Sequence, residues 1–198
     1  MNQPSIIDTI DSSVIESTSV TKEQTDEINF LIHLGFHENE PYKYQSYFQP
    51  EENVYIITLI DNHKTIAIAF IKKHTVDTYD ELPSEYFKIY NLSIHPNYRG
   101  YGLCGLLMKR ILQTKIDELP LQKHYLTLNV FTSKHNPNVS AIKCYQKHKF
   151  KFIPTVIEMR SEGPYTEMMR EPNFRKTKTT RSKQKKKQTK KKKKKKKQ

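Results

Sequence analysis

A glycine-rich turn near the middle of the chain constrains the fold more than any other feature of the sequence. Three of the protein's five glycines, Gly100, Gly102 and Gly105, fall within six residues. Residues 86–94 before the turn have the composition of a strand, and residues 103–115 after it have the leucine spacing of a helix. Because glycine adopts positive φ freely, we expect the chain to turn sharply here from a strand into a helix.

The same turn is a candidate site for an anion. The first N–H groups of a helix have no partner within the helix, and the helix dipole adds positive potential there. A glycine turn lets a ligand approach these donors closely, and phosphate groups bind in this geometry. Short glycine motifs also arise often by chance. A tight strand-to-helix turn without a ligand is therefore the alternative interpretation.

The net charge of +13 is divided unevenly along the 198 residues. Residues 172–198 hold sixteen Lys or Arg and no acid, whereas residues 1–171 hold eighteen Lys or Arg against twenty-one Asp and Glu. We therefore expect a slightly acidic domain at residues 21–171, preceded by a flexible lead-in at residues 1–20. Self-repulsion is expected to keep the Lys-rich tail disordered.

The tail is a candidate for non-specific binding. Residues 175–198 carry enough positive charge to attract nucleic acid or another acidic surface, with a strong dependence on salt. Stacking on bases is not expected, because no aromatic residue follows Phe174. A lysine expansion without a selected function is the alternative.

Cys104 and Cys144 are the only cysteines. Their spacing fits no metal site, and one pair is too few for the disulfide framework of a small secreted domain. We expect two reduced packing residues and no metal. No run reaches the ~18 apolar residues of a membrane span, and no secretory leader is evident. The sequence thus predicts an intracellular protein, cytoplasmic or nuclear and not secreted, and leaves its oligomeric state open.

Strand and helix patterns alternate along the domain. Thr21 followed three residues later by Gln24 forms a capping box that opens a helix, and Gly35 is expected to end it. Residues 54–60 and 65–73 predict a β-hairpin. Further strands are expected at 14–20, 86–94, 125–131, 150–159 and 165–170, and further helices at 103–115 and 138–148. This order predicts a mixed α/β fold, with a mostly antiparallel central sheet of about six or seven strands and helices on both faces.

The glycine turn resembles a known cofactor signature. The run Arg99-Gly100-Tyr101-Gly102-Leu103-Cys104 is similar to the acetyl-CoA-binding motif of the GNAT acyltransferase superfamily, which has Arg or Gln, two residues, Gly, one residue, and Gly or Ala. Cys104 departs from this pattern, but it is small and keeps its backbone N–H. The resemblance implies a cofactor site made of Leu92, Ser93, Ile94, Arg99, Gly100, Tyr101, Gly102, Leu103, Cys104, Gly105 and Asn138.

A second block resembles the same superfamily. Asn138, Ala141 and Tyr145 match its Asn-x-x-Ala-x-x-x-Tyr helix, and Phe150 matches the aromatic residue that follows. Lys149 stands where the family usually has glycine, at a helix end that often requires a left-handed backbone. A lysine costs about 1 kcal/mol there.

The resemblance implies that the chain is an N-acetyltransferase, with acetyl-CoA as donor and a primary amine as acceptor. Tyr145 would donate a proton to the departing CoA thiolate, since a phenol with a pKa near ~10 can protonate a thiolate. Asn138 would bind the pantetheine arm. An aromatic core residue and a helix N-cap are the respective alternatives. Both roles of Asn138 are compatible.

The general base and the acceptor are not identified by the sequence. The strand at residues 86–94 contains no acid, and Glu85, His95 and His124 are the candidates that flank it or the next strand. The acceptor is expected between residues 36–48 and 160–165. A protein N-terminus, a lysine side chain, a polyamine and a small amine all remain open.

Two other functions stay compatible with the sequence. A nucleic-acid-binding protein could act through its Lys-rich tail, with the domain as a scaffold. A degenerate acyl-CoA binder could retain the cofactor site without turnover, which the missing base would explain.

Overall fold

The computed structural model describes residues 10–36, 48–75, 83–133, 137–160 and 163–173. The Lys-rich tail beyond residue 173 and most of the expected acceptor segment at residues 36–48 lie outside these ranges. Expectations about them therefore remain predictions.

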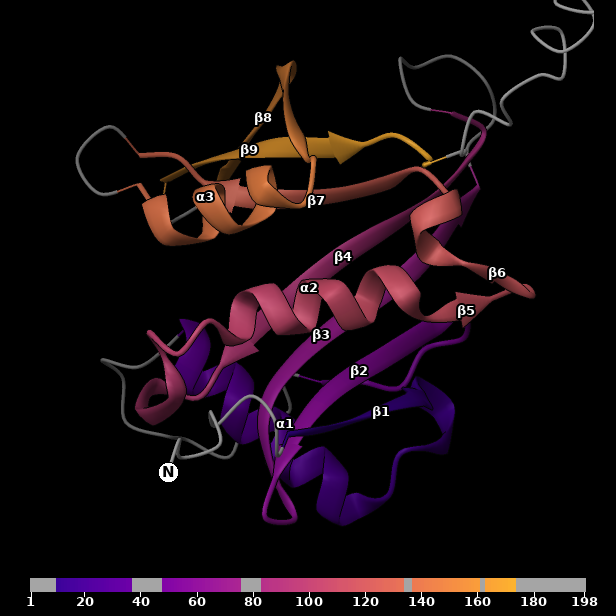
Figure 1. Ribbon diagram of the computed structural model, residues 1–198, viewed down its shortest axis with the longest axis vertical. Coiled ribbons are helices and arrows are strands. Elements are labelled where there is room, and N and C mark those ends of the chain that lie inside the picture. Colours follow the sequence, from indigo (N-terminus) through magenta and orange to yellow (C-terminus); the bar gives the residue numbers. More distant parts are fainter. Residues whose placement is uncertain (1–9, 37–47, 76–82, 134–136, 161–162, 174–198) are drawn as a thin grey trace, which may run out of the picture.

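A seven-stranded mixed sheet forms the centre of the molecule, in the order β1-β2-β3-β4-β7-β9-β8 (Figure 1). Every neighbouring pair is antiparallel except β4 and β7, which are parallel. The strands are β1 (Asp11–Glu16), β2 (Val54–Asp61), β3 (Lys64–Thr75), β4 (Glu85–Ile94), β7 (Leu126–Phe131), β8 (Lys151–Arg160) and β9 (Gly163–Arg170). The predicted fold class is confirmed.

Helices cover both faces of the sheet. Helix α1 (Lys22–Phe36) packs on one face of β3 and β4, and α2 (Leu103–Gln113) crosses the other face over β2 and β3. Helix α3 (Val139–Lys147) lies beside α2. The core accordingly has two clusters, a larger one under α2 and α3 and a smaller one under α1. Short elements complete the described chain: β5 (Lys115–Ile116), β6 (Leu119–Pro120) and 3₁₀ turns at Ser17–Ser19, Pro96–Tyr98 and Leu121–Lys123.

The structure confirms two local predictions, the capping box at Thr21 and the hairpin turn after residue 61. The Thr21 Oγ1 accepts from the N–H of Gln24 at 3.2 Å, while the Gln24 side chain accepts from the N–H of Thr21 at 2.9 Å. This reciprocal pair is the predicted capping box. The β2–β3 hairpin turns through Asn62 and His63, both with positive φ (46° and 65°). Two left-handed residues in succession match the twist of the flanking strands.

The beginning of the domain differs from expectation. A strand was expected at residues 14–20 within a flexible lead-in, but β1 starts at Asp11 and pairs with β2 over six residues. Its side chains alternate between exposed and half-buried, so an edge strand of this kind has little hydrophobic pattern to reveal it. The flexible lead-in is thus wrong for residues 11–16, which belong to the sheet.

Gly35 does not end the first helix as predicted, because α1 continues through Phe36. The glycine serves packing instead. A Cβ at Gly35 would clash with the Oγ of Ser93 and lie 2.9 Å from its Cβ. Only glycine therefore lets the end of α1 approach the end of β4 this closely.

The parallel pair β4–β7 separates towards one end. Pairing joins Phe87–Ile89 to Leu126–Leu128 only, although β4 continues to Ile94 and β7 to Phe131. Near the point of separation, Asn91 has φ 47° and the register between β3 and β4 shifts. The two strands thus open a gap in the sheet, and the candidate site lies there.

Candidate active site

Two adjoining cavities lie at the gap between β4 and β7. The first, about 680 Å³, is lined by both strands, by the start of α3 and by Tyr145 and Tyr165. The second, about 460 Å³, is lined by the glycine turn, the start of α2 and again by Tyr145. Gly35, Leu92, Asn138, Ser140, Ala141 and Tyr145 line both. One continuous site therefore runs from the glycine turn to the gap in the sheet.

The glycine turn presents open backbone donors to the second cavity. Gly100 and Gly102 have φ of 86° and 81°, and Gly102 is the N-cap of α2. The N–H groups of Leu103 and Cys104 make no hydrogen bond within the described residues. These donors, together with the positive end of the α2 dipole, suit a phosphate or pyrophosphate group. Among the expected cofactor residues, Tyr101 and Gly105 line neither cavity.

Arg99 lines the second cavity, but its guanidinium also has a structural task. The Nε donates to the carbonyl of Ile94 at 3.2 Å, and an Nη donates to the carbonyl of Leu34 at 3.1 Å. Arg99 thereby joins the end of α1 to the end of β4. Its predicted contact with a cofactor phosphate stays a prediction.

Ser93 and Ile94 also line the second cavity. The Ser93 hydroxyl is buried and donates to the carbonyl of Leu31 on α1 at 2.7 Å. This hydrogen bond is a second link between α1 and β4, in addition to the Arg99 hydrogen bonds and the close packing of Gly35 on Ser93. Ser93 is therefore a residue that shapes the site through its side chain.

Tyr145, the predicted proton donor, belongs to the lining that the two cavities share. It lies on the last turns of α3, is only 7% exposed, and lines both cavities. Burial raises the pKa of its hydroxyl to about 12. The phenol consequently keeps its proton at neutral pH and can act as a donor. The centroid of its ring lies 6.4 Å from that of the Phe150 ring.

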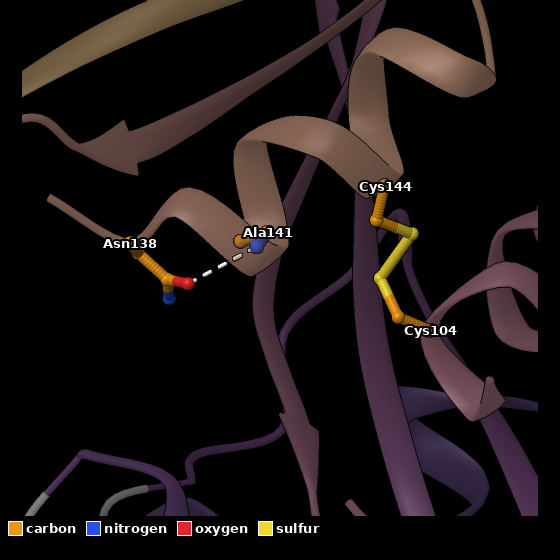
Figure 2. The surroundings of a disulfide bond; sticks show 4 residues. All are labelled: Cys104, Asn138, Ala141 and Cys144. Carbon is orange, nitrogen blue, oxygen red and sulfur yellow. Dashed lines mark hydrogen bonds between the residues drawn. A yellow bond between two sulfur atoms is a disulfide. The ribbon is translucent and has the colours of Figure 1, made fainter. Parts of the chain in front are cut away.

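Asn138 is the N-cap of α3, as one of its two expected roles requires. Its Oδ1 accepts from the N–H of Ala141 at 3.1 Å (Figure 2). The side-chain NH₂ makes no hydrogen bond in the described part of the chain and belongs to a residue that lines both cavities. Capping uses the oxygen only, so the amide donor stays available to a ligand.

The two cysteines form a disulfide, contrary to the prediction of two reduced packing residues. Cys104 in the first turn of α2 is bonded to Cys144 on α3, with their Cα atoms 6.5 Å apart (Figure 2). The separation of forty residues gave no sign of this, because only the packing of α2 against α3 brings the two together. The bond joins the two helices that flank the second cavity.

The turn after α3 shows how the chain accommodates Lys149 at the position where the family usually has glycine. This lysine has φ 72°, and the N–H of Phe150 reaches back to the carbonyl of Tyr145 at 3.1 Å. The left-handed conformation is therefore kept although glycine is absent. Phe150 is 2% exposed and fixes the end of α3 to the core.

The base candidates drawn from the sequence lie away from both cavities. Glu85 pairs with Lys73 at 3.2 Å, His124 packs edge-on against Phe87, and the His95 ring accepts from the N–H of Asn97. None of the three lines either cavity. The structure instead brings Lys88 on β4 into the lining of the first cavity, with Glu167 on β9 beside it. Sequence order could not reveal this neighbour, because Lys88 and Glu167 lie far apart in the chain.

Two absences hold for the described residues. They contain no cluster of three His, Cys, Asp or Glu that could hold a metal ion. None of their helices is long and apolar enough to cross a membrane.

Several solved structures share this fold. An acyl-CoA N-acyltransferase from Pseudomonas aeruginosa superposes with a TM-score of 0.60 at 17% identity, over 81% of this chain and 99% of that one. ElaA from Escherichia coli gives 0.58 at 18% identity, over 81% and 99%. NAA60 from Arabidopsis thaliana, solved in complex with acetyl-CoA, gives 0.56 at 16% identity, over 82% and 98%. No curated protein sequence matches the chain.

The sequence itself carries the stronger evidence. The profile of the Acetyltransferase (GNAT) family matches residues 21–150, about two thirds of the chain. That match includes the glycine turn, the gap between β4 and β7, and Tyr145. Because this family profile covers most of the domain, the chain belongs to the GNAT acetyltransferase family.

Proposed function

We propose that this protein transfers an acetyl group from acetyl-CoA to a primary amine. The observation that carries the proposal is the continuous site that joins the open donors of α2 to the gap between β4 and β7, with Tyr145 at the junction. A CoA derivative needs an anion site at one end and a reaction site at the other. We infer a catalytic unit at residues 11–171, since β1 pairs with β2, followed by the tail.

The donor fits the residues present. The N–H groups of Leu103 and Cys104, which lack partners in the described chain, would bind the pyrophosphate. The amide of Asn138 would donate to the pantetheine arm. Acetyl-CoA supplies the activated thioester. Backbone N–H groups of β4 near Leu92, beyond its pairing with β7, would stabilise negative charge on the thioester oxygen.

Tyr145 would donate its proton to the sulfur that leaves. The high pKa of the buried hydroxyl keeps the donor loaded at neutral pH. The amine must lose a proton before it attacks, since it is an ammonium ion at neutral pH. The acceptor class, whether a protein N-terminus, a lysine, a polyamine or a small amine, is left open by this site.

The test is thiol release from acetyl-CoA with four acceptors: a peptide with a free N-terminus, a peptide with only a lysine amine, spermidine and a small amine. We expect release with at least one of them, and a loss of about 100-fold or more in kcat for Tyr145→Phe. Tyr125→Phe, a half-buried tyrosine outside both cavities, is the matched control. Acetyl-CoA binding without turnover by any acceptor would favour the degenerate binder instead.

The tail is a separate part of the proposal. We infer that residues 175–198 bring the enzyme to acidic surfaces, nucleic acid included, through charge alone. The affinity of the full chain for a mixed-sequence RNA should then fall steeply between 50 and 200 mM salt. A loss of about 10³-fold or more is usual for proteins that make many phosphate contacts. It should not respond to acetyl-CoA.

A further inference from the structure

A polar surface lies on the sheet face opposite α2 and α3, next to the first cavity. On β4 and β7, Phe87, Ile89, Leu126 and Leu128 point to the larger core under α2 and α3. The alternate residues Lys88, Thr127 and Asn129 must point to the other face. Lys88 and Asn129 both line the first cavity there. An acceptor can thus approach the gap from the face opposite the glycine turn.

Glu167 on β9 completes this surface. It pairs in register with Asn129 on β7, and Tyr165, which lines the first cavity, points the same way two residues earlier. The Oε1 of Glu167 lies 4.0 Å from the Nζ of Lys88. Glu167 itself lines neither cavity, but its neighbours Lys88, Asn129 and Tyr165 all line the first one.

The carboxylate of Glu167 is unusual because it lacks a hydrogen-bond partner in the described part of the chain. The residue is only 6% exposed, yet its carboxylate makes no hydrogen bond within the described chain, and the Lys88 Nζ at 4.0 Å is beyond hydrogen-bond distance. The Thr127 Oγ1 on the same face is also buried without a partner in the described residues. Buried polar groups are nearly always hydrogen-bonded in folded proteins. A nearly buried carboxylate without a hydrogen bond, whose neighbours line a cavity, indicates a place where a polar ligand binds.

We propose that Glu167 is the catalytic carboxylate of the acceptor site, which binds the ammonium group of the acceptor and takes its proton. The proposal rests on the acetyl transfer proposed above and supplies the base that β4 lacks. Its acceptors are primary amines that enter as ammonium ions from the β9 side. Among the described residues, Lys88 is the one charged side chain that lines the first cavity, and its Nζ lies 4.0 Å from the Glu167 carboxylate.

The proton balance closes without another reactant. Glu167 takes one proton from the ammonium ion, which leaves a neutral amine. The amine nitrogen forms a bond to the thioester carbon, and the bond from that carbon to sulfur breaks. The sulfur receives a proton from Tyr145, the nitrogen gives up a further proton to the Tyr145 phenolate as the amide forms, and Glu167 releases its proton to solvent. Since Tyr145 is on α3 and Glu167 on the opposite face, the deprotonation of the ammonium ion and the protonation of the sulfur have separate proton carriers.

Several charged and titratable side chains share this face of the sheet with Glu167. They are Lys72 and His74 on β3, Tyr86 and Lys88 on β4, and Tyr165 on β9. Burial, followed by the charges of Lys72 and Lys88, lowers the pKa of His74, so this ring is neutral at pH 7. Lys72 is paired with Glu51. Of these cations in the described part of the chain, Lys88 is the one that forms an ion pair with Glu167.

The experiment compares Glu167→Gln with the unsubstituted full chain, using the acceptor that gave thiol release above. We expect kcat/KM for the amine to fall about 100-fold or more. The pH profile should also change. In the unsubstituted protein the rate levels off once Glu167 is ionised, whereas in Glu167→Gln it should keep rising towards the pKa of the amine itself, near ~10 for a lysine. Thermal stabilisation by acetyl-CoA should be unchanged.

A purely structural pairing of Glu167 with Lys88 makes the opposite prediction. If Glu167 only neutralised Lys88, the double variant Lys88→Gln with Glu167→Gln would recover activity. If Glu167 is the base, the double variant should be as slow as Glu167→Gln alone. Glu167→Asp, which keeps the charge and is the variant to use should Gln not fold, should keep the level part of the pH profile at a reduced rate. Glu118→Gln, at an exposed acid in the β5–β6 turn, is the matched control.

The possible failures are distinct. If no amine releases thiol with the unsubstituted protein, the proposed acetyl transfer itself is wrong. If Glu167→Gln keeps its rate and its pH profile, the acetyl transfer stands and the role of Glu167 is wrong. Recovery in the double variant also overturns that role.

Discussion

Cys104 in the first turn of α2 and Cys144 on α3, next to Tyr145, are joined by a disulfide. One bond therefore links the residue that offers a backbone N–H to the second cavity with the neighbour of Tyr145, the proposed proton donor. The α2–α3 spacing, which sets the width of that cavity, is held covalently. Stability and cofactor binding should depend on the same bond.

We expect Cys144→Ser to lower the free energy of unfolding by up to about 4 kcal/mol, the value that loop-entropy estimates give for a closed loop of this length. Forty residues separate the two cysteines. Urea denaturation measures the loss. Dithiothreitol should destabilise the unsubstituted protein by a similar amount and leave Cys144→Ser unaffected. An equal response of both proteins to the reductant would show that the bond is not the cause.

Burial of Tyr145 predicts a loss of stability at high pH. The folded protein holds the phenol proton up to a pKa of about 12, whereas an unfolded tyrosine loses it near ~10. The unfolded state binds fewer protons in this window, so the free energy of unfolding falls as pH rises from about 10 to 12. Tyr145→Phe should show a smaller fall in urea denaturation over this range, and Tyr125→Phe should not.

The two roles of Asn138 can be separated by one pair of variants. Asp caps helices as well as Asn does, but its ionised side chain cannot donate. We expect Asn138→Asp to keep its thermal stability and to raise KM for acetyl-CoA. Asn138→Ala should also lose about 1 kcal/mol of stability, because the Ala141 N–H loses its acceptor. An unchanged KM in Asn138→Asp would leave only the capping role.

The elements and the donor half of the site could be predicted from the sequence because their signals are local. The capping box at Thr21, the hairpin turn at Asn62 and the glycines before α2 each specify a backbone conformation through their own chemistry. The motif around Arg99 and the helix from Asn138 to Tyr145 then identified the family. Nothing distant in the chain is needed for any of these.

The remaining features depend on contacts between distant segments. The disulfide requires α2 to pack against α3, and the packing of Gly35 on Ser93 requires α1 to end over β4. Glu167 meets Lys88 only because β9 inserts next to β7, so that the last strand in sequence lies near the centre of the site. Periodicity and spacing report neither strand order nor the meeting of helices, so these residues had no signal in the sequence.

Lys149 offers a stabilising substitution. Its backbone is left-handed, with φ 72°, where a side chain is disfavoured and glycine is not. We expect Lys149→Gly to raise the free energy of unfolding by about 1 kcal/mol, seen as a higher urea midpoint at unchanged slope. Lys147→Gly, two residues earlier within α3, should instead lower it by about 1 kcal/mol. Destabilisation by both would mean that the left-handed turn is not strained.

Substitution of Gly35 tests whether the contact of α1 with β4 shapes the site. A methyl group there would overlap the Ser93 side chain, which holds α1 through its 2.7 Å bond to the Leu31 carbonyl. We expect Gly35→Ala to cost about 1–3 kcal/mol, as overpacking usually does, and to weaken acetyl-CoA binding because Gly35 lines both cavities. Ser93→Gly removes the overlapping atoms, so the double variant should be more stable than the two separate losses predict. Strictly additive losses in urea denaturation would show that the two residues do not meet, and the close approach of α1 to β4 would have to be abandoned.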